Sequence, residues 1–270
     1  MRRPLTFACQ GATLAGVLHP ATGTTGVVIV SGGVQTRAGS HRGFVDLADR
    51  FAAAGHPTLR FDRRGVGDSD GDDRSFRDSA DDIASAIAEI RAQVPELKQV
   101  IGWGLCDGAS ALTLNAATLG LDGLILANPW TRDADAPTDV PPRAAVAARY
   151  RQRLTSPREW VRLTRRGFDV RKAARGLLRM ALPEAVPLTA RSMAASLQSF
   201  TGPSILLLSG RDATAQAFEA LWRSATFRLP KARKDIEVTI LPDATHTFAR
   251  AEDAAAMAKV SIDWISGKEW

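Results

Sequence analysis

Short apolar runs alternate with helical stretches along most of this 270-residue chain, and this alternation constrains the fold more than any other feature. The runs rich in β-branched and aliphatic residues are typical of buried strands. They lie at residues 26–30, 57–61, 99–101, 121–127, 204–208 and 236–241. Helical spacing of apolar residues predicts helices over about 44–54, 79–92 and 252–265. The pattern predicts an α/β fold, with a mostly parallel sheet flanked by helices and an antiparallel pair near 5–7 and 13–18 at one edge.

The alternation stops between residues 131 and 200, where no strand-like run occurs. We expect several short helices there, so the chain divides into a core of residues 1–130 and 201–270 and an inserted helical cap of residues 131–200. Arginine is concentrated in this segment and accounts for the chain's formal net charge of +6. The arginines have two interpretations: solvated helix faces, or a positive field that attracts an anionic or carrier-bound substrate. Nucleic acid is not expected as a partner, because no basic strand with interleaved aromatic residues accompanies them.

The strongest chemical signal is a glycine-rich run between a predicted strand and a predicted helix, Gly102-Trp-Gly104-Leu-Cys106-Asp-Gly108. Its Gly-x-Cys-x-Gly spacing has the form of a nucleophile elbow, with Cys where Ser is usual. The backbone at such a turn is strained, and larger side chains two residues away would collide with it. The N-terminus of the following helix favours a thiolate and, later, an oxyanion. Cys106 is therefore the candidate nucleophile, and a buried, inert cysteine in a glycine-rich turn is the alternative.

A dinucleotide-binding loop is a second interpretation of the same glycines. The run lies in the middle of the chain, however, and no acidic residue ends the next strand to hold a ribose. The chain's two cysteines, Cys9 and Cys106, are also too few for a disulfide framework or a thiolate zinc site. They fit a reducing compartment. We therefore expect no cofactor and no metal.

A candidate acid and a candidate base follow two later strands. Asp212 comes just after the run at 204–208, and His246 comes just after the run at 236–241. Both positions fall at carboxyl ends of strands, where open α/β sheets bind ligands, and the chain order is nucleophile, acid, base. Asp243 is closer to the histidine in sequence and stays open as an alternative acid.

These three residue types in this order indicate covalent acyl chemistry. His246 would take the proton of Cys106, and Asp212 would hold the imidazole in one tautomer and stabilise its charged form. Cys106 would attack an acyl carbon and form a thioester, which water activated by His246 would hydrolyse.

An oxyanion hole needs two backbone N–H groups beside the nucleophile. One is expected from Asp107, the residue after Cys106, and the other from the loop that follows the first buried strand. In that loop Gly33 and Val34 are both candidates, and the sequence does not decide between them.

A further stretch carries a family resemblance. The run Asp62-Arg-Arg-Gly65-Val-Gly67-Asp68-Ser69 resembles the Asp-x-Arg-Gly-x-Gly-x-Ser stretch of the α/β-hydrolases, in which it is usually structural. With the elbow, the acid and the histidine, the resemblance covers nearly the whole chain except the predicted cap. It implies the α/β-hydrolase fold.

Within that superfamily the run from Gly32 to Arg42, Asn128-Pro-Trp130 and the cysteine elbow are similar to the exosortase A system-associated hydrolase 1 group. This resemblance implies a bacterial enzyme linked to exopolysaccharide and exosortase gene clusters, and it names no substrate. Dienelactone hydrolases share a cysteine elbow, but their compact form lacks a cap of this length.

Three residues near these motifs are candidates for a substrate pocket. They are Arg37 and His41, which follow the oxyanion loop beside Arg42, and Trp130, which ends a core strand. They would supply cations and an aromatic wall. Ion pairing within the loop and packing against the cap are an equally good interpretation.

We expect a cofactor-independent acyl hydrolase, an esterase or thioesterase, that acts on a small-molecule acyl ester or thioester. Acyl transfer with the same residues and a catalytically weak ligand-binding protein on a hydrolase scaffold are the alternatives. No run approaches the roughly 18 apolar residues of a membrane span. The start of the chain also lacks the apolar core of a secretory signal, so a cytoplasmic protein is expected.

Overall fold

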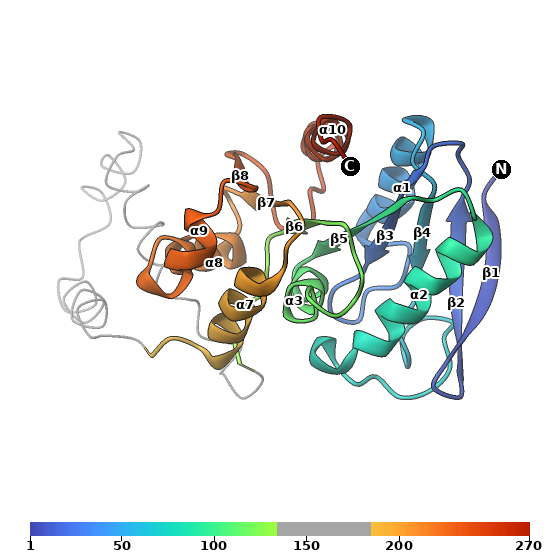
Figure 1. The fold of residues 1–270 in the computed structure, drawn as a ribbon, viewed down its shortest axis with the longest axis horizontal. Coiled ribbons are helices and arrows are strands. Elements are labelled where there is room, and N and C mark those ends of the chain that lie inside the picture. The colour runs from blue at the N-terminus through green and yellow to red at the C-terminus, as the bar shows by residue number, and fades with distance from the viewer. Residues whose placement is uncertain (134–184) are drawn as a thin grey trace, which may run out of the picture.

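The computed structural model describes residues 1–133 and 185–270, and most of the predicted cap, residues 134–184, lies outside the described residues. In the described residues eight strands form one sheet in the order β1-β2-β4-β3-β5-β6-β7-β8 (Figure 1). Their bounds are Arg3–Cys9 (β1), Ala12–His19 (β2), Thr25–Val30 (β3), Thr58–Phe61 (β4), Gln99–Leu105 (β5), Gly123–Ala127 (β6), Ser204–Ser209 (β7) and Ile236–Leu241 (β8).

The sheet is antiparallel at one edge and parallel elsewhere. β1 pairs antiparallel with β2, and β2 pairs antiparallel with β4, whereas every pairing from β4 through β8 is parallel. The register places Val30 of β3 beside Gly104 of β5, and Leu105 beside Ala127 of β6. The loops that follow these strands therefore meet at one edge of the sheet, the usual place for a ligand in such folds.

Helices cover both faces of the sheet (Figure 1). Their bounds are Gly43–Ala53 (α1), Ala80–Gln93 (α2), Asp107–Leu114 (α3), Leu188–Ser199 (α7), Ala213–Trp222 (α8), Arg228–Ala232 (α9) and Ala251–Ser266 (α10), with short 3-10 turns at Ser40–Arg42, Phe76–Asp78 and Ala225–Phe227. Alternate strand residues face opposite sides, so Val27 and Ile29 of β3 join the core under α1 and α10, and Val28 and Val30 join the core under α2, α3, α7 and α8.

The strands and helices predicted for the core are confirmed, and β5 is longer than predicted. The sequence placed this strand at 99–101, whereas it continues to Leu105 through two glycines. Glycine has little β-propensity, which hid the continuation. The strand persists because Trp103 and Leu105 are buried against α1 and α10.

The last helix within the range predicted for the cap packs on the core. α7 buries Ala190, Met193 and Leu197 in the cluster that also contains residues of α3. Its N-terminus is held by Asp133, which accepts the backbone N–H groups of Leu188 and Thr189 at 2.9 Å each. Asp133 and the start of α7 are thereby held together on the core.

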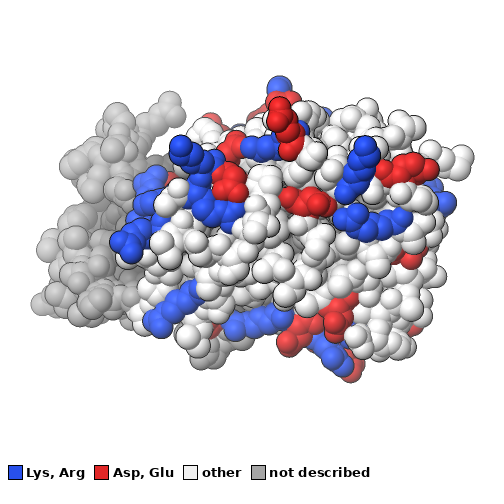
Figure 2. All heavy atoms as spheres, in the orientation of Figure 1, with Lys and Arg blue, Asp and Glu red and all other residues white. Residues whose placement is uncertain are grey.

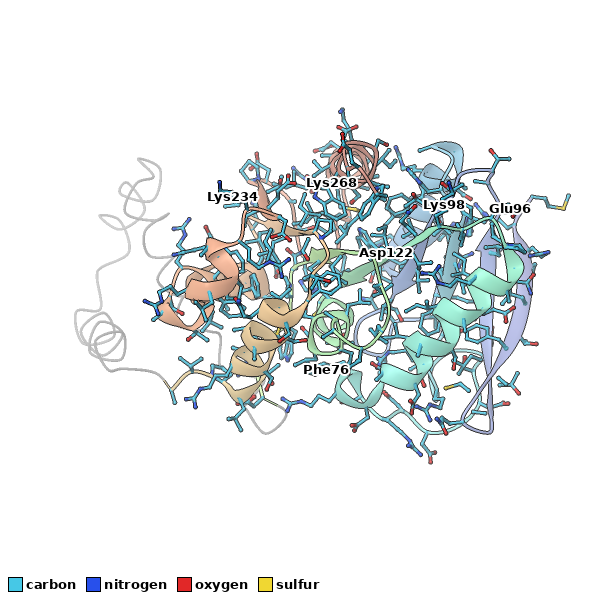
Figure 3. All side chains as sticks on the ribbon, viewed as in Figure 1. Phe76, Glu96, Lys98, Asp122, Lys234 and Lys268 are labelled. Atoms are coloured by element: carbon cyan, nitrogen blue, oxygen red, sulfur yellow. The ribbon has the colours of Figure 1, made fainter. Side chains whose placement is uncertain are left out.

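Charged side chains in the described residues are mixed in sign. Figure 2 shows basic and acidic groups beside one another on the face of the molecule that is turned to the viewer. In Figure 3, Lys98, Asp122 and Lys234 mark the edge of the sheet at which β5, β6 and β8 begin. These charges are thus at the edge opposite the carboxyl ends of the parallel strands.

Candidate active site

Cys106 occupies the sharp turn between β5 and α3. Its backbone has φ 58° and ψ −122°, a conformation that a residue with a side chain rarely adopts. A Cβ on Gly104 would lie 2.7 Å from the backbone N of Ala109, and one on Gly108 would lie 2.4 Å from the carbonyl oxygen of Val30. Both glycines are therefore required by close backbone approach, as the elbow interpretation predicts.

Asp212 and His246 lie side by side at the ends of β7 and β8. The Nδ1 atom of His246 is 2.9 Å from Oδ2 of Asp212. The carboxylate also caps α8, accepting the backbone N–H groups of Thr214 at 3.2 Å and Ala215 at 2.9 Å. These fixed donors hold the carboxylate in place, so it orients the imidazole with Nδ1 toward the acid.

His246 has an unusual proton affinity. Burial by itself lowers the pKa of the ring, but hydrogen bonds to Asp212 and Cys106 and the negative charge of both groups outweigh it and raise the pKa to about 10. An imidazole with this pKa stays protonated at neutral pH. The Asp212 carboxylate beside the ring therefore favours the protonated imidazole.

Asn128 connects the acid side and the base side of the site. It follows β6 in the left-handed region, with φ 45°, and its side chain is fully buried. Its Nδ2 donates to Ser209 Oγ and to the backbone carbonyl of His246, both at 2.9 Å, and its Oδ1 accepts the backbone N–H of Ser209 at 2.8 Å. In the sequence, Asn128 is prominent only as part of the family resemblance. The available signal was a polar residue directly after a buried strand, of a type that tolerates positive φ.

Asp243, the alternative acid, lies elsewhere. Its residue is exposed, and Arg250 donates to its backbone carbonyl at 3.0 Å. The carboxylate that contacts His246 is that of Asp212.

The structure also places Gly32, Gly33 and Asp107 beside the nucleophile. A Cβ on Gly32 would lie 3.2 Å from Cys106 Cβ and 2.5 Å from Asp107 Oδ1, so the loop after β3 passes directly over the elbow. The backbone N–H of Gly33 donates to Asp107 Oδ1. Val34 is largely exposed, at 82%. The Gly33 N–H, one of the candidate oxyanion donors, thus already bonds to a carboxylate. Nothing in the sequence indicated this bond.

The three pocket candidates have different surroundings. Arg37 forms ion pairs with Asp62 and Asp68, which matches the alternative of pairing within the loop. His41 is exposed. Trp130 is close to the nucleophile through the backbone, because its N–H donates to the carbonyl of Cys106 at 3.2 Å. Of the three, only Trp130 has a hydrogen bond to the elbow within the described part of the chain.

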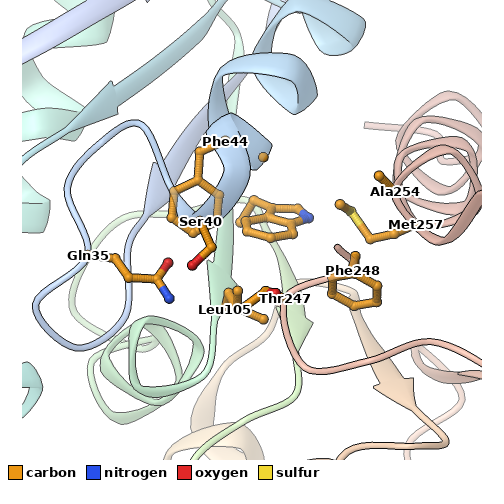
Figure 4. A pocket seen from close by; sticks show the side chains of 10 residues that line it. Gln35, Ser40, Phe44, Leu105, Thr247, Phe248, Ala254 and Met257 are labelled. Carbon is orange, nitrogen blue, oxygen red and sulfur yellow. The ribbon is translucent and has the colours of Figure 1, made fainter. Parts of the chain in front are cut away.

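A small cavity of about 20 Å³ lies under the site (Figure 4). Its apolar walls include Phe44, Trp103 and Phe248, and it is bounded by Leu105, which precedes Cys106, and Thr247, which follows His246. This volume accommodates about one water molecule. The cavity is therefore a packing gap behind the loops that carry Cys106 and His246, and it is too small for an acyl chain.

The described residues contain no group of three or more His, Cys, Asp or Glu side chains placed to hold a metal ion. Nor does any helix in residues 1–133 or 185–270 have the length and apolarity to cross a membrane.

Comparison with known proteins agrees with this architecture. A search of curated protein sequences finds no match to the chain. Among solved structures, the esterase Pf2001 of Pyrococcus furiosus has a TM-score of 0.66 at 13% identity and covers 99% of this chain and 92% of that one. A thermostable carboxyl esterase of Bacillus coagulans has a TM-score of 0.65 at 17% identity, with 98% of each chain covered.

Est1E of Butyrivibrio proteoclasticus, solved with ferulic acid bound, has a TM-score of 0.61 at 17% identity and covers 97% of this chain and 99% of that one. At such identities the likeness shows a shared fold. The family is shown separately, because residues 27–260 match the model of the alpha/beta hydrolase family. This match spans most of the sequence, and the chain therefore belongs to the alpha/beta hydrolase family.

Proposed function

We propose that this protein hydrolyses a small-molecule ester or thioester through a covalent acyl-cysteine intermediate. Cys106 is the nucleophile, His246 the acid and base, and Asp212 the residue that orients His246. The observation that carries the proposal is the hydrogen-bonded Asp212–His246 pair, at 2.9 Å, with the histidine bonded in turn to the cysteine of the elbow.

The proposed reaction begins with Cys106 as a thiolate and His246 as an imidazolium. The Cys106 thiolate attacks the acyl carbon, and the carbonyl oxygen becomes an oxyanion at the N-terminus of α3. As the tetrahedral adduct collapses, the His246 imidazolium gives its proton to the departing alkoxide or thiolate. The neutral imidazole then takes a proton from water, whose oxygen attacks the thioester. Release of the carboxylic acid restores the thiolate–imidazolium pair.

Two features favour an ester or thioester over an amide. A thiolate is a better leaving group than an amine, so the adduct of an amide returns to substrate unless the amine is protonated first. In addition, the structures that share this fold include proteins described as esterases. The chemistry needs no metal or cofactor, because the nucleophile, the base and the oxyanion donors are all supplied by this chain.

The finer predictions from the sequence belong to this proposal. We retain the similarity to the exosortase A system-associated hydrolase group, which rests on the run from Gly32 to Arg42, Asn128-Pro-Trp130 and the cysteine elbow. We also retain the cytoplasmic location and the helical cap. An exosortase gene beside the gene for this protein would support the assignment to that group, and its absence across related genomes would contradict it.

Intact-protein mass spectrometry during reaction with p-nitrophenyl butyrate and butyryl-CoA tests the mechanism. We expect a transient butyryl adduct on the wild-type protein and free butyrate as product. Cys106→Ala should give no adduct and lose more than about 100-fold in turnover while remaining folded. Cys9→Ala is the matched control, because Cys9 is the other free cysteine and is buried in the core.

Other outcomes have definite meanings. A folded Cys106→Ala variant with near-wild-type turnover would refute the assignment. An adduct that persists in water but leaves when an alcohol or amine is added would show an acyltransferase instead. An adduct that persists under all these conditions would show a ligand-binding protein.

A further inference from the structure

The carboxylate of Asp107 occupies the place where the oxyanion of the proposed reaction should bind. Asp107 is the first residue of α3, directly after the nucleophile, and its Oδ1 accepts the backbone N–H of Gly33. That N–H is one of the candidate donors for the oxyanion, and a carboxylate oxygen has the same negative charge and the same need for a donor.

The surroundings hold Asp107 in this position. A Cβ on Gly32 would lie 2.5 Å from Asp107 Oδ1, so the absence of a side chain at residue 32 is what makes room for the carboxylate. On the other side of the loop, Arg63 is only 2% exposed and donates through Nη2 to the carbonyl oxygen of Gly33 at 2.5 Å. The loop is thus held by Asp107 at its N–H and by Arg63 at its carbonyl.

The charged and titratable groups around Asp107 oppose one another. Arg63 attracts the carboxylate, and the backbone N–H groups of Gly33 and Gly108 bond to it. Asp73 repels it, and Cys106, which bonds to His246, precedes Asp107 at the same helix end. Burial is the largest influence and raises the pKa of Asp107 above its usual value.

We propose that the Asp107 carboxylate is an internal occupant of the oxyanion hole and must release the Gly33 N–H before Cys106 can be acylated. The negative charge of this side chain therefore slows acylation, and protonation of Asp107 in acid relieves the slowing. The inference rests on the proposed function, because an oxyanion forms only if Cys106 attacks an acyl carbon.

The physical reason is competition between like charges for one donor. An oxyanion and a carboxylate cannot share the Gly33 N–H, and each also repels the other across the elbow. Protonation of Asp107 removes its charge and weakens its bond to the N–H, because hydrogen bonds to ionised acceptors are about twice as strong as those to neutral ones. Asp107 thus acts through the Gly33 donor as a positioning residue.

Asp107→Asn tests the proposal, because the amide has the same shape and no charge. The measurement is the single-turnover rate of Cys106 acylation by p-nitrophenyl butyrate at a series of pH values from mildly acid to alkaline, because a raised pKa brings the protonation of Asp107 toward the acid end of the series. We expect the variant to react about tenfold faster than wild type at the alkaline end, which is part of the roughly 100- to 1000-fold value of one oxyanion donor. The ratio should approach one at the acid end.

Asp73→Asn is the matched control. It removes a negative charge that acts on Asp107, but Asp73 is exposed and its carboxylate accepts from Ser75 rather than from Gly33. Acylation should change by less than about twofold, because the interaction of exposed charges is small. A second readout is reversible inhibition by butyraldehyde, whose adduct on Cys106 places an oxygen in the same hole. Its inhibition constant should fall about tenfold in Asp107→Asn at alkaline pH, in proportion to the freed donor.

The outcomes separate the two proposals. If Cys106 is acylated but Asp107→Asn reacts at the wild-type rate or more slowly at every pH, the inference about Asp107 is wrong and the proposed function stands. If Cys106 is not acylated in either protein, both are wrong. If Asp107→Asn does not fold, Asp107→Ser repeats the test, and failure of both variants to fold would show that the carboxylate has a structural role instead.

Discussion

Two buried carboxylates follow parallel strands at the same edge of the sheet, and they bind different partners. Asp62 follows β4 and is fully buried, and Asp212 follows β7 and is 7% exposed. Asp62 pairs with the guanidinium of Arg37, and Asp212 pairs with the imidazole of His246. Arginine stays charged at any physiological pH, whereas histidine exchanges its proton. The partner, and not the position or the burial, separates the structural carboxylate from the one proposed for catalysis.

The two sites also differ in how closed they are. Asp62 accepts backbone N–H groups from Arg37 and from Asp68, the latter at 3.1 Å, and a Cβ on Gly67 would lie 2.3 Å from its Oδ2. The loops around it are fitted to the carboxylate on every side. At the other site His246 keeps 32% of its side chain exposed. Arg37, the partner of Asp62, keeps 23% of its side chain exposed, so the Asp62 site is the more closed of the two by a small margin.

The largest expected effect is that of Asp212→Asn on activity. The amide would retain the volume but disturb the tautomer and the charge balance of His246, so kcat should fall by about 1000- to 10,000-fold. The melting temperature should change little, because the amide oxygen still caps α8. Steady-state kinetics and a thermal unfolding curve on the same preparation check both parts. A loss of activity below tenfold would show that Asp212 does not orient the base.

Asp62→Asn should give the reverse pattern. The substitution removes the buried charge that pairs with Arg37, while the ion pair of Arg37 with the exposed Asp68 remains, so the free energy of unfolding should fall by about 1–3 kcal/mol. Turnover per folded molecule should stay within about threefold, since no reacting atom is involved. Urea denaturation combined with titration of the Cys106 adduct measures stability and activity separately. If turnover per folded molecule fell as far as in Asp212→Asn, the contrast between the two carboxylates would not hold.

The pH dependence should reveal the raised pKa of His246. For an alkyl ester such as ethyl butyrate the leaving alkoxide needs the imidazolium proton, so kcat should decline as the pH rises through about 10. Asp212→Asn removes the charge of Asp212 and weakens its hydrogen bond to His246, whereas the contributions of Cys106 remain. The pKa of His246 should therefore be lower, and the decline of kcat should move to lower pH. p-Nitrophenyl butyrate serves as the control substrate, because its leaving group needs no proton and should show little decline. Equal profiles for both substrates would exclude His246 as the general acid.

The smallest effect is expected from Asp243→Asn. The residue is exposed, and its interaction with Arg250 runs through the backbone carbonyl, which the substitution retains. Turnover should change by less than about twofold, within the range of a surface substitution. A change comparable with that of Asp212→Asn would restore Asp243 as the acid.

Much of the fold and of the site could be predicted because the signals are local. The apolar runs fix strands and the glycine spacing fixes the elbow, since Gly104 and Gly108 are required by backbone contacts within the turn or with the adjacent strand β3. The chain order of Cys106, Asp212 and His246 was sufficient to nominate them, because strands in a parallel sheet end at a common edge.

Other features could not be predicted because they depend on contacts between distant segments. The bridge from Asn128 to Ser209 and His246 joins residues separated by 81 and 118 positions. For Arg37 the sequence allowed two interpretations equally, a contact with substrate or an ion pair within the loop. The fold of the loop after β3 brings Arg37 to Asp62.

By itself, the sequence determined the order of the candidate residues along the chain: a cysteine at a strained turn, then a carboxylate, then a histidine, each after a buried strand. Hydrophobic periodicity and the steric limits on glycine positions act over a few residues, so they can be recognised in the sequence alone. Tertiary structure alone decided that Asp212 rather than Asp243 meets His246, and that the side chain of Asp107 takes the Gly33 N–H. Both outcomes depend on which loops meet at the sheet edge to within a hydrogen bond, and no local pattern encodes a distance of that kind.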